Sequence, residues 1–212
     1  MADWATISSL ATAGGTLVLA VATFSSVRSS NRSARVAELS LLAGLRPLLI
    51  PSKESDPPEH IRFGDDVWVT VPGHGAAVKL EKGNVYMAVG LRNGGSGLAV
   101  IHGWHLHFDF EGLPLQDAPD PESFRRQLRD LYIPAGDTGF WQGAVRDPAD
   151  PDKDPLCEGV RTGGRILIDL LYGDHEGGQR EIARFAITAD RSQEGERAEV
   201  VRYWNIDRAA PR

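Results

Sequence analysis

The densest group of side chains that could bind a metal lies at residues 102–109, where the sequence is His-Gly-Trp-His-Leu-His-Phe-Asp. Alternate residues of a β-strand point to the same face, so His105, His107 and Asp109 are expected to project together. Imidazole and carboxylate groups that meet on one face are ligands for zinc, iron or manganese. The alternative is an amphipathic strand whose polar face meets solvent and binds nothing.

The spacing of two of these histidines and a later glutamate resembles a known metal-binding pattern. His105, His107 and Glu111 are similar to the first motif of the cupin family, His-x-His-x3-Glu, and residues 134–136 resemble part of the second cupin motif. The resemblance implies a metal-dependent enzyme in which these three residues hold the metal. The chain departs from the family at Gly139, which stands where the second motif carries a histidine.

A second polar cluster, Asp174-His175-Glu176, lies directly before Gly177 and Gly178. A carboxylate beside a histidine can orient the ring for general-base catalysis. Adjacent residues on a strand point to opposite faces, however, and paired glycines mark a turn, so these side chains are expected to satisfy a hairpin. The sequence contains no serine-hydrolase elbow, phosphate-binding loop, dinucleotide fingerprint or HExxH motif, and we assign no catalytic residue and no cofactor.

Composition limits the partners of the chain. With 212 residues and a net charge of -6, the chain is unsuited to nucleic acid as its main partner, because phosphate binding needs clustered Lys and Arg. Its one cysteine, Cys157, cannot form an internal disulfide and has no neighbouring set of zinc ligands. The 42% of hydrophobic residues suffice for a packed core in a domain of ordinary size.

The elements that must position these side chains begin with an uncharged N-terminal segment. Residues 4–27 contain no charged side chain, and as a helix they span roughly 36 Å, enough for the ~30 Å hydrocarbon core of a bilayer. We therefore expect a transmembrane and juxtamembrane helix over residues 1–45. Two alternatives are a signal peptide cleaved after Ala22, although no positive charge precedes the segment, and a buried helix of a soluble domain.

Charges that flank this segment predict its orientation. Only Asp3 precedes it, whereas Arg28, Arg32 and Arg35 follow it. Cytoplasmic flanks of membrane helices carry the excess of Lys and Arg, so the protein is expected to cross the plasma (inner) membrane once, with its N-terminus outside and its C-terminal domain in the cytoplasm. Trp4 is expected at the outer interface of that membrane, where indole rings accumulate.

Small side chains recur along one face of the same helix, at Ser8, Thr12, Thr16 and Ala20. Small residues let helix backbones approach closely in lipid, which predicts a homo-oligomer formed through this face. The alternative is a generic anchor rich in alanine and serine, in which the spacing has no role.

The sequence of residues 46–212 predicts a second, mainly β region. Apolar and β-branched runs, separated by Gly, Pro, Asn and Asp, indicate antiparallel strands rather than βαβ units. The expected strands lie at residues 48–50, 67–71, 85–91, 98–110, 139–145, 165–172, 180–188 and 198–206. Their number and the short turns between them favour an immunoglobulin-like β-sandwich.

Three connections in this region carry specific expectations. Residues 93–97, Asn-Gly-Gly-Ser-Gly, are expected to join the strands on either side as a hairpin. The sequence after Asp120 predicts the one short helix of the domain, with Phe124 on its apolar face. The opposite face carries Arg125, Arg126 and Arg129. This face could dock on lipid headgroups or an acidic partner, or it could simply be solvated. Residues 147–154, rich in Asp and Pro, are expected to form an exposed loop.

Three short stretches, residues 43–49, 91–99 and 171–176, are similar to a group of actinobacterial membrane-anchored proteins with an immunoglobulin-like sandwich. The resemblance covers nearly the whole chain, anchor included, and it implies the same layout. Its motifs are signatures of turns and strands, and it implies no catalytic residue. The first functional hypothesis is therefore a membrane-tethered binding or scaffolding module for an unknown protein partner. The second is a cupin-like metal-dependent enzyme.

Overall fold

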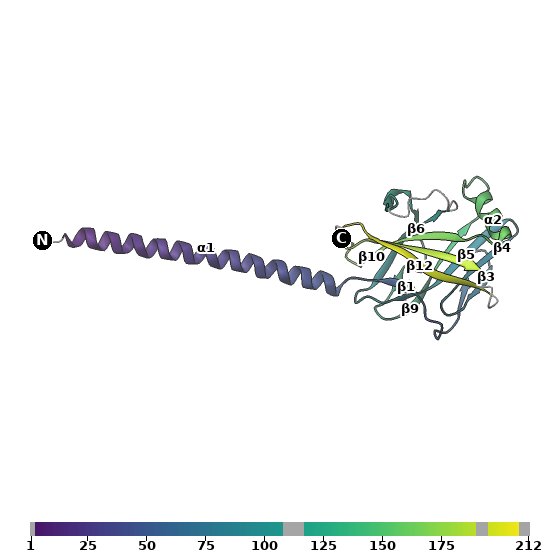
Figure 1. The fold of residues 1–212 in the computed structure, drawn as a ribbon, viewed down its shortest axis with the longest axis horizontal. Coiled ribbons are helices and arrows are strands. Elements are labelled where there is room, and N and C mark those ends of the chain that lie inside the picture. Colours follow the sequence, from purple (N-terminus) through teal and green to yellow (C-terminus); the bar gives the residue numbers. More distant parts are fainter. Residues whose placement is uncertain (1–2, 108–116, 190–194, 208–212) are drawn as a thin grey trace. The chain divides into compact units, whose positions relative to one another are not determined.

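A computed structural model describes residues 3–107, 117–189 and 195–207 of the chain, and it describes only the backbone of residues 4–9, 11 and 189. The chain divides into two compact units, Met1–Gly44 and Leu45–Arg212. Figure 1 draws the first as a helix and the second as a mainly β structure. The mainly antiparallel β class and the long N-terminal helix predicted from the sequence are confirmed.

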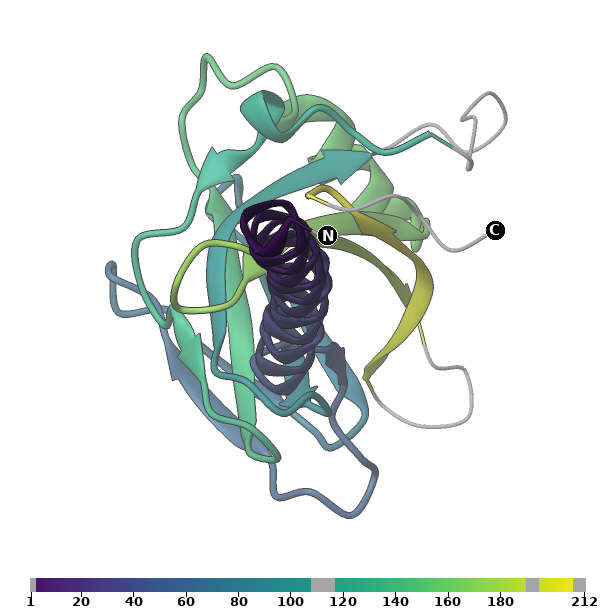
Figure 2. The ribbon, with the colours of Figure 1, turned by 90° about the vertical axis from the view of Figure 1, so that its left-hand side faces the viewer.

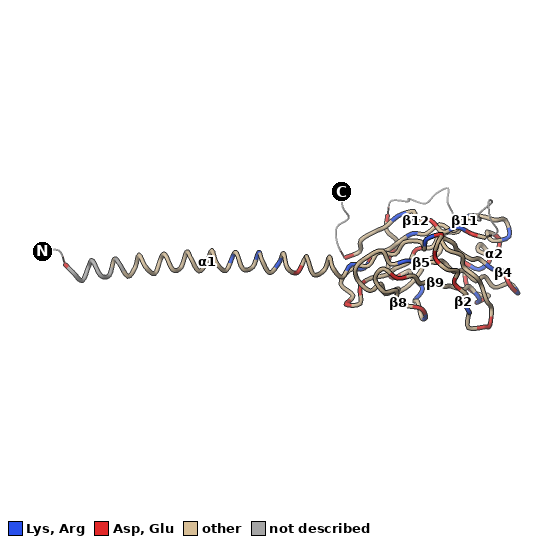
Figure 3. The backbone as a smooth tube through the Cα atoms, turned by 90° about the horizontal axis from the view of Figure 1, so that it is seen from below, with Lys and Arg blue, Asp and Glu red and all other residues tan. Residues whose placement is uncertain are grey.

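The first unit is one helix, α1 (Trp4–Gly44), of 41 residues. The helix contains no proline, and it ends at Gly44, just before Pro47. Its sequence contains no charged residue before Arg28, and Figure 3 shows blue Lys and Arg segments only along the C-terminal half of the helix. Within the described residues, no helix combines the length and the apolar character needed to cross a membrane.

The side chains of α1 leave apolar surface around the helix. The hydroxyl of Thr16 donates to the carbonyl oxygen of Thr12 (2.9 Å), and that of Thr23 donates to the carbonyl oxygen of Leu19 (2.8 Å), so these polar groups bond within the helix. Ten large apolar side chains are exposed: Leu10, Leu17, Val18, Leu19, Val21, Phe24, Val27, Val36, Leu39 and Leu41. Because successive helical residues turn by about 100°, those between residues 17 and 27 cover more than one side of the helix.

The second unit contains strands and two short helical elements within its described residues. In chain order these are β1 (Leu49–Pro51), β2 (Glu59–Arg62), β3 (Trp68–Val71), β4 (Gly75–Glu81), β5 (Asn84–Asn93), β6 (Ala99–His107), the 3-10 turn η1 (Pro121–Ser123), β7 (Arg125–Arg126), β8 (Tyr132–Ile133), β9 (Thr138–Val145), α2 (Lys153–Thr162), β10 (Ile166–Gly173), β11 (Glu181–Ala189) and β12 (Glu196–Asn205).

One antiparallel sheet includes ten of the described strands. Eight of them follow the order β1-β5-β4-β12-β11-β10-β6-β7. The other two pair with strands of this series: β9 with the other edge of β5, and β8 with β6, beyond β7. The strands β2 and β3 form a separate two-stranded sheet. Figure 2 shows the strands of the large sheet curving around a shared interior. Trp104 on β6 and Trp141 on β9 meet in that interior with ring centroids 5.4 Å apart, although these two strands are not paired. The sheet thus folds back so that strands from its two ends face each other.

The interior is built by the alternation of side chains along each strand. Four alternate residues of β5 are fully buried in it: Val85, Met87, Val89 and Leu91. Burial of one such aliphatic side chain stabilises a fold by about 1.5–3 kcal/mol. The indole of Trp141 lies over Gly143, where a Cβ atom would stand 2.5 Å from its Cζ2 atom. Glycine at this position therefore leaves the space that the largest core side chain needs.

The expected hairpin across residues 93–97 is wrong. β5 pairs with β1, β4 and β9, and β6 pairs with β10, β7 and β8, so this connection carries the chain between facing parts of the sheet. The buried side chain of Asn93 explains the difference, because it bonds to three other segments. Its Nδ2 atom donates to the carbonyl oxygens of Gly97 (2.7 Å) and Ile133 (3.0 Å), and its Oδ1 atom accepts from the amides of Leu48 (3.1 Å) and Gly95 (3.0 Å).

The glycines of this connection make room for the chain that enters the second unit. A Cβ atom on Gly95 would lie 2.4 Å from the carbonyl oxygen of Arg46, and one on Gly97 would lie 1.8 Å from that of Leu45. The amide of Gly97 also donates to the carbonyl oxygen of Arg46 (3.3 Å). The glycine-rich sequence therefore accommodates a passing segment rather than a tight two-strand turn, and we call residues 45–48 and 93–97 the Asn93 corner.

The amphipathic helix expected after Asp120 does not form at that position. Asp120 does cap a helical turn, since its Oδ1 atom accepts from the amide of Glu122 (3.0 Å), but the turn is the three-residue η1. The chain then forms β7, which pairs with β6. Phe124 packs beside the small apolar cluster of Leu171, Ile182 and Trp204. The open edge of β6 and this contact outweigh the weak helical preference of the segment.

The loop expected at residues 147–154 is confirmed over residues 147–152, but a helix that was not expected begins at its end. α2 begins at Lys153, inside the expected loop at residues 147–154, and its chain turns at Gly163, which adopts a left-handed φ of 68°. Leu156 and Cys157 on this helix are buried. Proline in a first helical turn needs no amide partner, so the Asp- and Pro-rich composition concealed a helix start. The strands β2 and β4 were not expected from the sequence either.

We expect Asn93→Ala to lower the free energy of unfolding by about 2–4 kcal/mol, because it leaves buried backbone donors and acceptors at the Asn93 corner without partners. Asn84→Ala is the matched control, since that side chain is partly buried and accepts from Lys153 Nζ at 3.2 Å; we expect its cost to be below about 1 kcal/mol. Urea unfolding of the full chain measures both. Equal losses in the two variants would contradict the role given to Asn93.

Candidate functional site

The histidines singled out in the sequence lie together on β6. His105 and His107 point to the same face, and their ring centroids are 4.6 Å apart. Trp104 and Leu106 are buried in the core instead. Asp109 and Glu111 lie outside the described residues. The structure therefore places two of the three expected cupin-like ligands.

Two residues from neighbouring strands join these histidines. Asp169 on β10 is in register with His105 on one side and with Arg184 of β11 on the other. Arg184 donates from Nε to Asp169 Oδ1 (2.6 Å) and from Nη2 to Asp169 Oδ2 (2.7 Å). His107 Nε2 lies 2.5 Å from the same Oδ2 atom. We call His105, His107, Asp169 and Arg184 the outer-face network, because the core lies on the other side of these strands.

Asp169 is the central charge of the outer-face network. Burial opposes its ionised form, but hydrogen bonds from Arg184 and His107 outweigh burial and hold the pKa of Asp169 below its usual value. Asp169 and Arg184 are both almost completely excluded from solvent, and the ring of Trp204 lies 4.9 Å from the guanidinium carbon of Arg184. Loss of either partner would leave the other charge buried without compensation.

Two buried nitrogen atoms of the network lack a hydrogen-bond partner in the described part of the chain. They are Nδ1 of His105 and Nη1 of Arg184. Burial, followed by the positive charge that His107 can carry, lowers the pKa of His105. This shift favours the neutral form of the His105 ring, which stands 5.9 Å from that of Phe124.

The network can offer a metal three ligand atoms, because one atom each from His105, His107 and Asp169 lie within 4.8 Å of one another. Both carboxylate oxygens of Asp169, however, already accept from Arg184. A cation at this place would lie beside the guanidinium and be repelled by it, or it would have to break a buried ion pair. The arrangement is better suited to holding β6, β10 and β11 together than to binding a metal.

Asp169 and Arg184 were not predicted as members of a site, although the sequence carries a signal for both. Each is a lone charge within an apolar strand, Ile-Leu-Ile-Asp-Leu-Leu in β10 and Ile-Ala-Arg-Phe-Ala-Ile in β11. Charged side chains are almost never fully buried unless they are paired. Opposite charges in neighbouring predicted strands could therefore have been matched, but the register that joins them is not visible in the sequence.

The second polar cluster of the sequence organises a turn. Asp174 is buried, and its Oδ1 atom accepts from the amides of Glu176 (3.1 Å) and Gly178 (2.9 Å). Its Oδ2 atom accepts from Gln179 Nε2 at 3.1 Å. His175 and Glu176 are exposed. Asp174 therefore holds the hairpin between β10 and β11, as expected, and its carboxylate is occupied by the turn.

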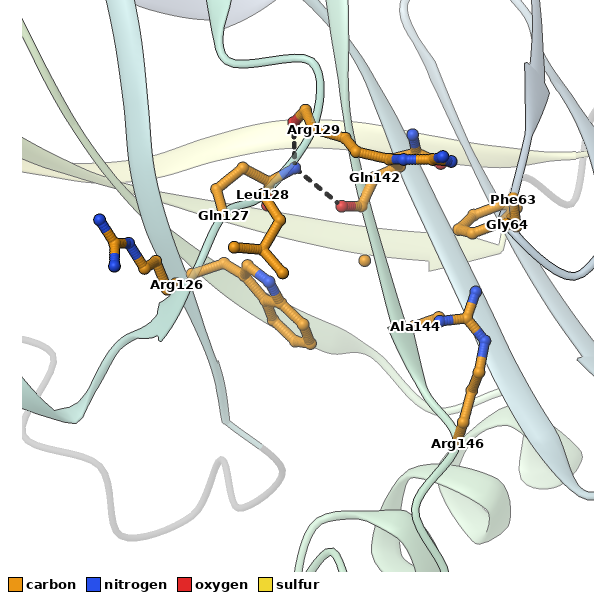
Figure 4. Close-up of a pocket in the computed structure, with 11 residues that line it drawn as sticks. Phe63, Gly64, Arg126, Gln127, Leu128, Arg129, Gln142, Ala144 and Arg146 are labelled. Atoms are coloured by element: carbon orange, nitrogen blue, oxygen red, sulfur yellow. Dashed lines mark hydrogen bonds between the residues drawn. The ribbon is translucent and has the colours of Figure 1, made fainter.

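A groove opens where β7 and β9 approach each other without pairing, and we call it the seam groove (Figure 4). Its volume is about 230 Å³. Gln127 bridges the two sides with its side-chain amide, which donates to the carbonyl oxygens of Gln142 (3.3 Å) and Arg129 (2.8 Å). The groove is lined by Phe63, Gly64, Trp104, Arg126, Gln127, Leu128, Arg129, Gln142, Gly143, Ala144 and Arg146.

The rim of the seam groove is rich in arginine. Arg146 binds Asp65 (3.0 Å), so its charge is compensated. Arg126 and Arg129 are exposed, and neither has an ion-pair partner among the described residues. Arg125, which the expected helix grouped with them, is turned away to bind Asp150 at 2.7 Å. The groove therefore offers two free guanidinium groups to a carboxylate or a phosphate.

We expect Arg184→Met to destabilise the protein by about 3–5 kcal/mol, because it leaves the Asp169 carboxylate buried without its cation. The double variant Arg184→Met/Asp169→Leu should recover most of that loss, since it removes both charges. Arg161→Met, on the exposed side of α2, is the control and should change the free energy of unfolding by less than about 0.5 kcal/mol. Failure of the double variant to recover stability would show that the pair is not the source of the loss.

The lowered pKa of Asp169 also predicts a pH dependence. A carboxylate with a depressed pKa in the folded state contributes stability above its unfolded pKa of about 3.9, and that contribution is lost as the pH falls through the folded pKa. The stability gap between the natural chain and Asp169→Asn should therefore narrow from pH 5 towards pH 2. Urea unfolding at stepped pH measures the gap, and a gap that stays constant would contradict the assignment.

The two groups of side chains differ in what they leave available. The outer-face network uses its charges internally, whereas the seam groove exposes two guanidinium groups beside apolar side chains. The geometry thus favours recognition of a ligand at the seam over chemistry at the histidines. Comparison of the chain with models of protein families, with curated proteins and with solved structures finds no match.

Proposed function

We propose that the chain is a membrane-tethered binding module, in which residues 4–27 enter a lipid bilayer and the second unit binds a protein partner through the seam groove. The observation that carries the binding role is the pair of free guanidinium groups of Arg126 and Arg129 at the rim of that groove. Interfaces are enriched in arginine and aromatic residues, and Trp104 lines the same groove.

The tether is supported by the surface of α1. Leu17, Val18 and Leu19 are consecutive and exposed, so the helix is apolar on more than one side rather than amphipathic. Such a surface is suited to contact with lipid or protein. The arginines at 28, 32 and 35 follow it and favour a single-pass topology in the plasma (inner) membrane, with the second unit in the cytoplasm.

Two further elements of the tether stay predictions. The side chains of Trp4 and Ser8 lie outside the described residues, so the indole at the outer interface and the start of the small-residue face are proposed from the sequence alone. Thr12, Thr16 and Ala20 are exposed, as a homo-oligomeric helix contact requires.

The second unit suits a binding role through its architecture. The connection through residues 93–97 joins facing parts of the folded sheet. Facing layers are a feature of the immunoglobulin-like sandwich that the resemblance to actinobacterial membrane-anchored proteins implies, although here one sheet supplies both layers. Sandwiches of this kind recognise partners through loops and strand edges. The seam groove lies at two such edges.

A cupin-like metal-dependent enzyme is the second candidate function. It is favoured by the ligand atoms of His105, His107 and Asp169, which lie within 4.8 Å of one another, and it is disfavoured by Arg184. Metal analysis of purified protein separates the two candidates. We expect no stoichiometric transition metal, whereas a bound metal that His105→Ala/His107→Ala loses would establish the enzyme candidate instead.

Charge placed in α1 tests the tether. Leu17→Arg/Leu19→Arg should move the full-length protein from the membrane to the soluble fraction, because each arginine near the centre of a span costs about 2.5–3.5 kcal/mol of insertion. Leu39→Arg is the control on the same helix and should leave the distribution unchanged. A C-terminal reporter should read cytoplasm in the natural chain. A soluble natural chain, or a C-terminus outside, would overturn the tether or its orientation.

A photo-crosslinker tests the binding role in cells. Leu128 is 79% exposed and lines the seam groove, so p-benzoylphenylalanine at this position should link to a discrete protein partner. The same crosslinker at position 161 on α2 does not line the groove and should give no such product. Absence of any adduct specific to position 128 would contradict the proposed binding role.

A further inference from the structure

The edge of β9 that faces the seam groove has no strand partner among the described residues. The amide of Ser52 donates to the carbonyl oxygen of Gly90, so the backbone groups of Gly90 point away from β9. Gly90 is paired with Phe140, and in an antiparallel ladder the groups of such a pair point away from each other. The alternation then turns the N–H and C=O groups of Phe140, Gln142 and Ala144 towards the seam.

The bond from Gln127 supports this orientation. Its side-chain amide reaches the carbonyl oxygen of Gln142 across the seam at 3.3 Å. No strand in the described part of the chain pairs with this edge of β9. An open edge of this kind is a template on which an extended peptide can add as a further strand.

The side chains around the edge select the charge of such a peptide. Figure 4 places Arg126 on one side of the groove and Arg129 and Arg146 on the other, near Phe63. Arg126 and Arg129 are exposed and free of carboxylate partners among the described residues, whereas Arg146 already binds Asp65. The free guanidinium groups therefore favour carboxylates at intervals along a bound chain.

A short acidic segment fits better than an extended polyanion. The chain as a whole carries a net charge of -6, which opposes a long polyanion more strongly than a short segment with a few carboxylates. Asp65 and Asp130 also lie near the groove, bound to Arg146 and Gln142 respectively. A volume of about 230 Å³ holds one or two side chains, and the rest of a segment would lie along the rim.

We propose that an extended acidic segment of a partner protein adds to the seam edge of β9 as a new strand. Its backbone pairs with Phe140, Gln142 and Ala144, displacing the side-chain amide of Gln127, and its carboxylates bind Arg126 and Arg129. An apolar side chain of the segment enters the groove against Trp104. This inference rests on the proposed binding function and names the class of its partner.

Calorimetry with defined peptides tests the charge preference. The probe is an octapeptide of alternating Glu and Val with capped ends, added to the full-length protein in detergent at low salt, and the control peptide has Lys in place of Glu. The Glu peptide should bind at least tenfold more tightly than the Lys peptide. Arg126→Ala/Arg129→Ala should weaken its binding at least tenfold, while the matched control Arg161→Ala/Arg165→Ala leaves it unchanged. Equal binding of both peptides would overturn the proposal.

N-methylation of the peptide tests the strand pairing itself. Two versions of the Glu peptide carry methyl groups on alternate amides, one in each register. Because a strand presents its N–H groups to opposite edges in turn, one register should lose binding at least tenfold and the other should retain it. Equal effects in both registers would mean charge attraction without strand addition and would overturn the proposal.

The outcomes also separate this inference from the binding function on which it rests. If no acidic peptide binds but the crosslinker at position 128 still captures a protein, the partner class is wrong and the binding module stands. If neither result is obtained, both are wrong.

Discussion

The sheet of the second unit folds back on itself without pairing of its two end strands among the described residues, and the rest of this unit depends on that constraint. Packing of Trp104 against Trp141 brings strands from its two ends face to face. Gly143 allows the contact, because any Cβ atom there would overlap the indole of Trp141. At the seam itself, the side chain of Gln127 spans the distance that a ladder of backbone hydrogen bonds would otherwise cover. A core, a groove and an open strand edge all follow from this one arrangement.

Two polar clusters hold the folded sheet in this form. The Asn93 corner joins the entering chain, β5 and the segment at Ile133, so that the parts of the sheet cannot slide apart without breaking buried hydrogen bonds. On the other side of the sheet, the pair of Asp169 and Arg184 joins β10 to β11, and His107 extends it to β6. Both clusters bond most of their polar atoms internally, although Nη1 of Arg184 has no hydrogen-bond partner among the described residues. At the seam, Arg126 and Arg129 have no ion-pair partner among the described residues, which is the physical reason to look for a ligand there.

Sequence patterns predicted the features that depend on neighbouring residues. The long helix followed from good helix formers without proline, and the alternation of Trp104 and Leu106 with the histidines followed from the period of a strand. Asp174 was expected in a turn because two glycines come after it. Features that depend on distant residues were missed. Asn93 and the glycines after it have the sequence of a hairpin turn, yet the side chain of Asn93 bonds to Leu48 and Ile133. Similarly, β7 forms because it pairs with an edge of β6, and no local sequence pattern reveals that edge. The pairing of Asp169 with Arg184 likewise needs a register between strands, and the seam groove needs the whole fold.

Hydrogen exchange along β9 in the free protein tests the open seam most directly. We predict that the amides of Phe140, Gln142 and Ala144 exchange quickly, because they face the seam without strand partners among the described residues. The amides of Trp141 and Gly143 should exchange slowly, because they bond to β5. Resolved by NMR, this gives an alternation of fast and slow residues. Uniform protection along the whole strand would mean that the sheet is closed at this edge, and it would contradict the account on which the proposed binding surface depends.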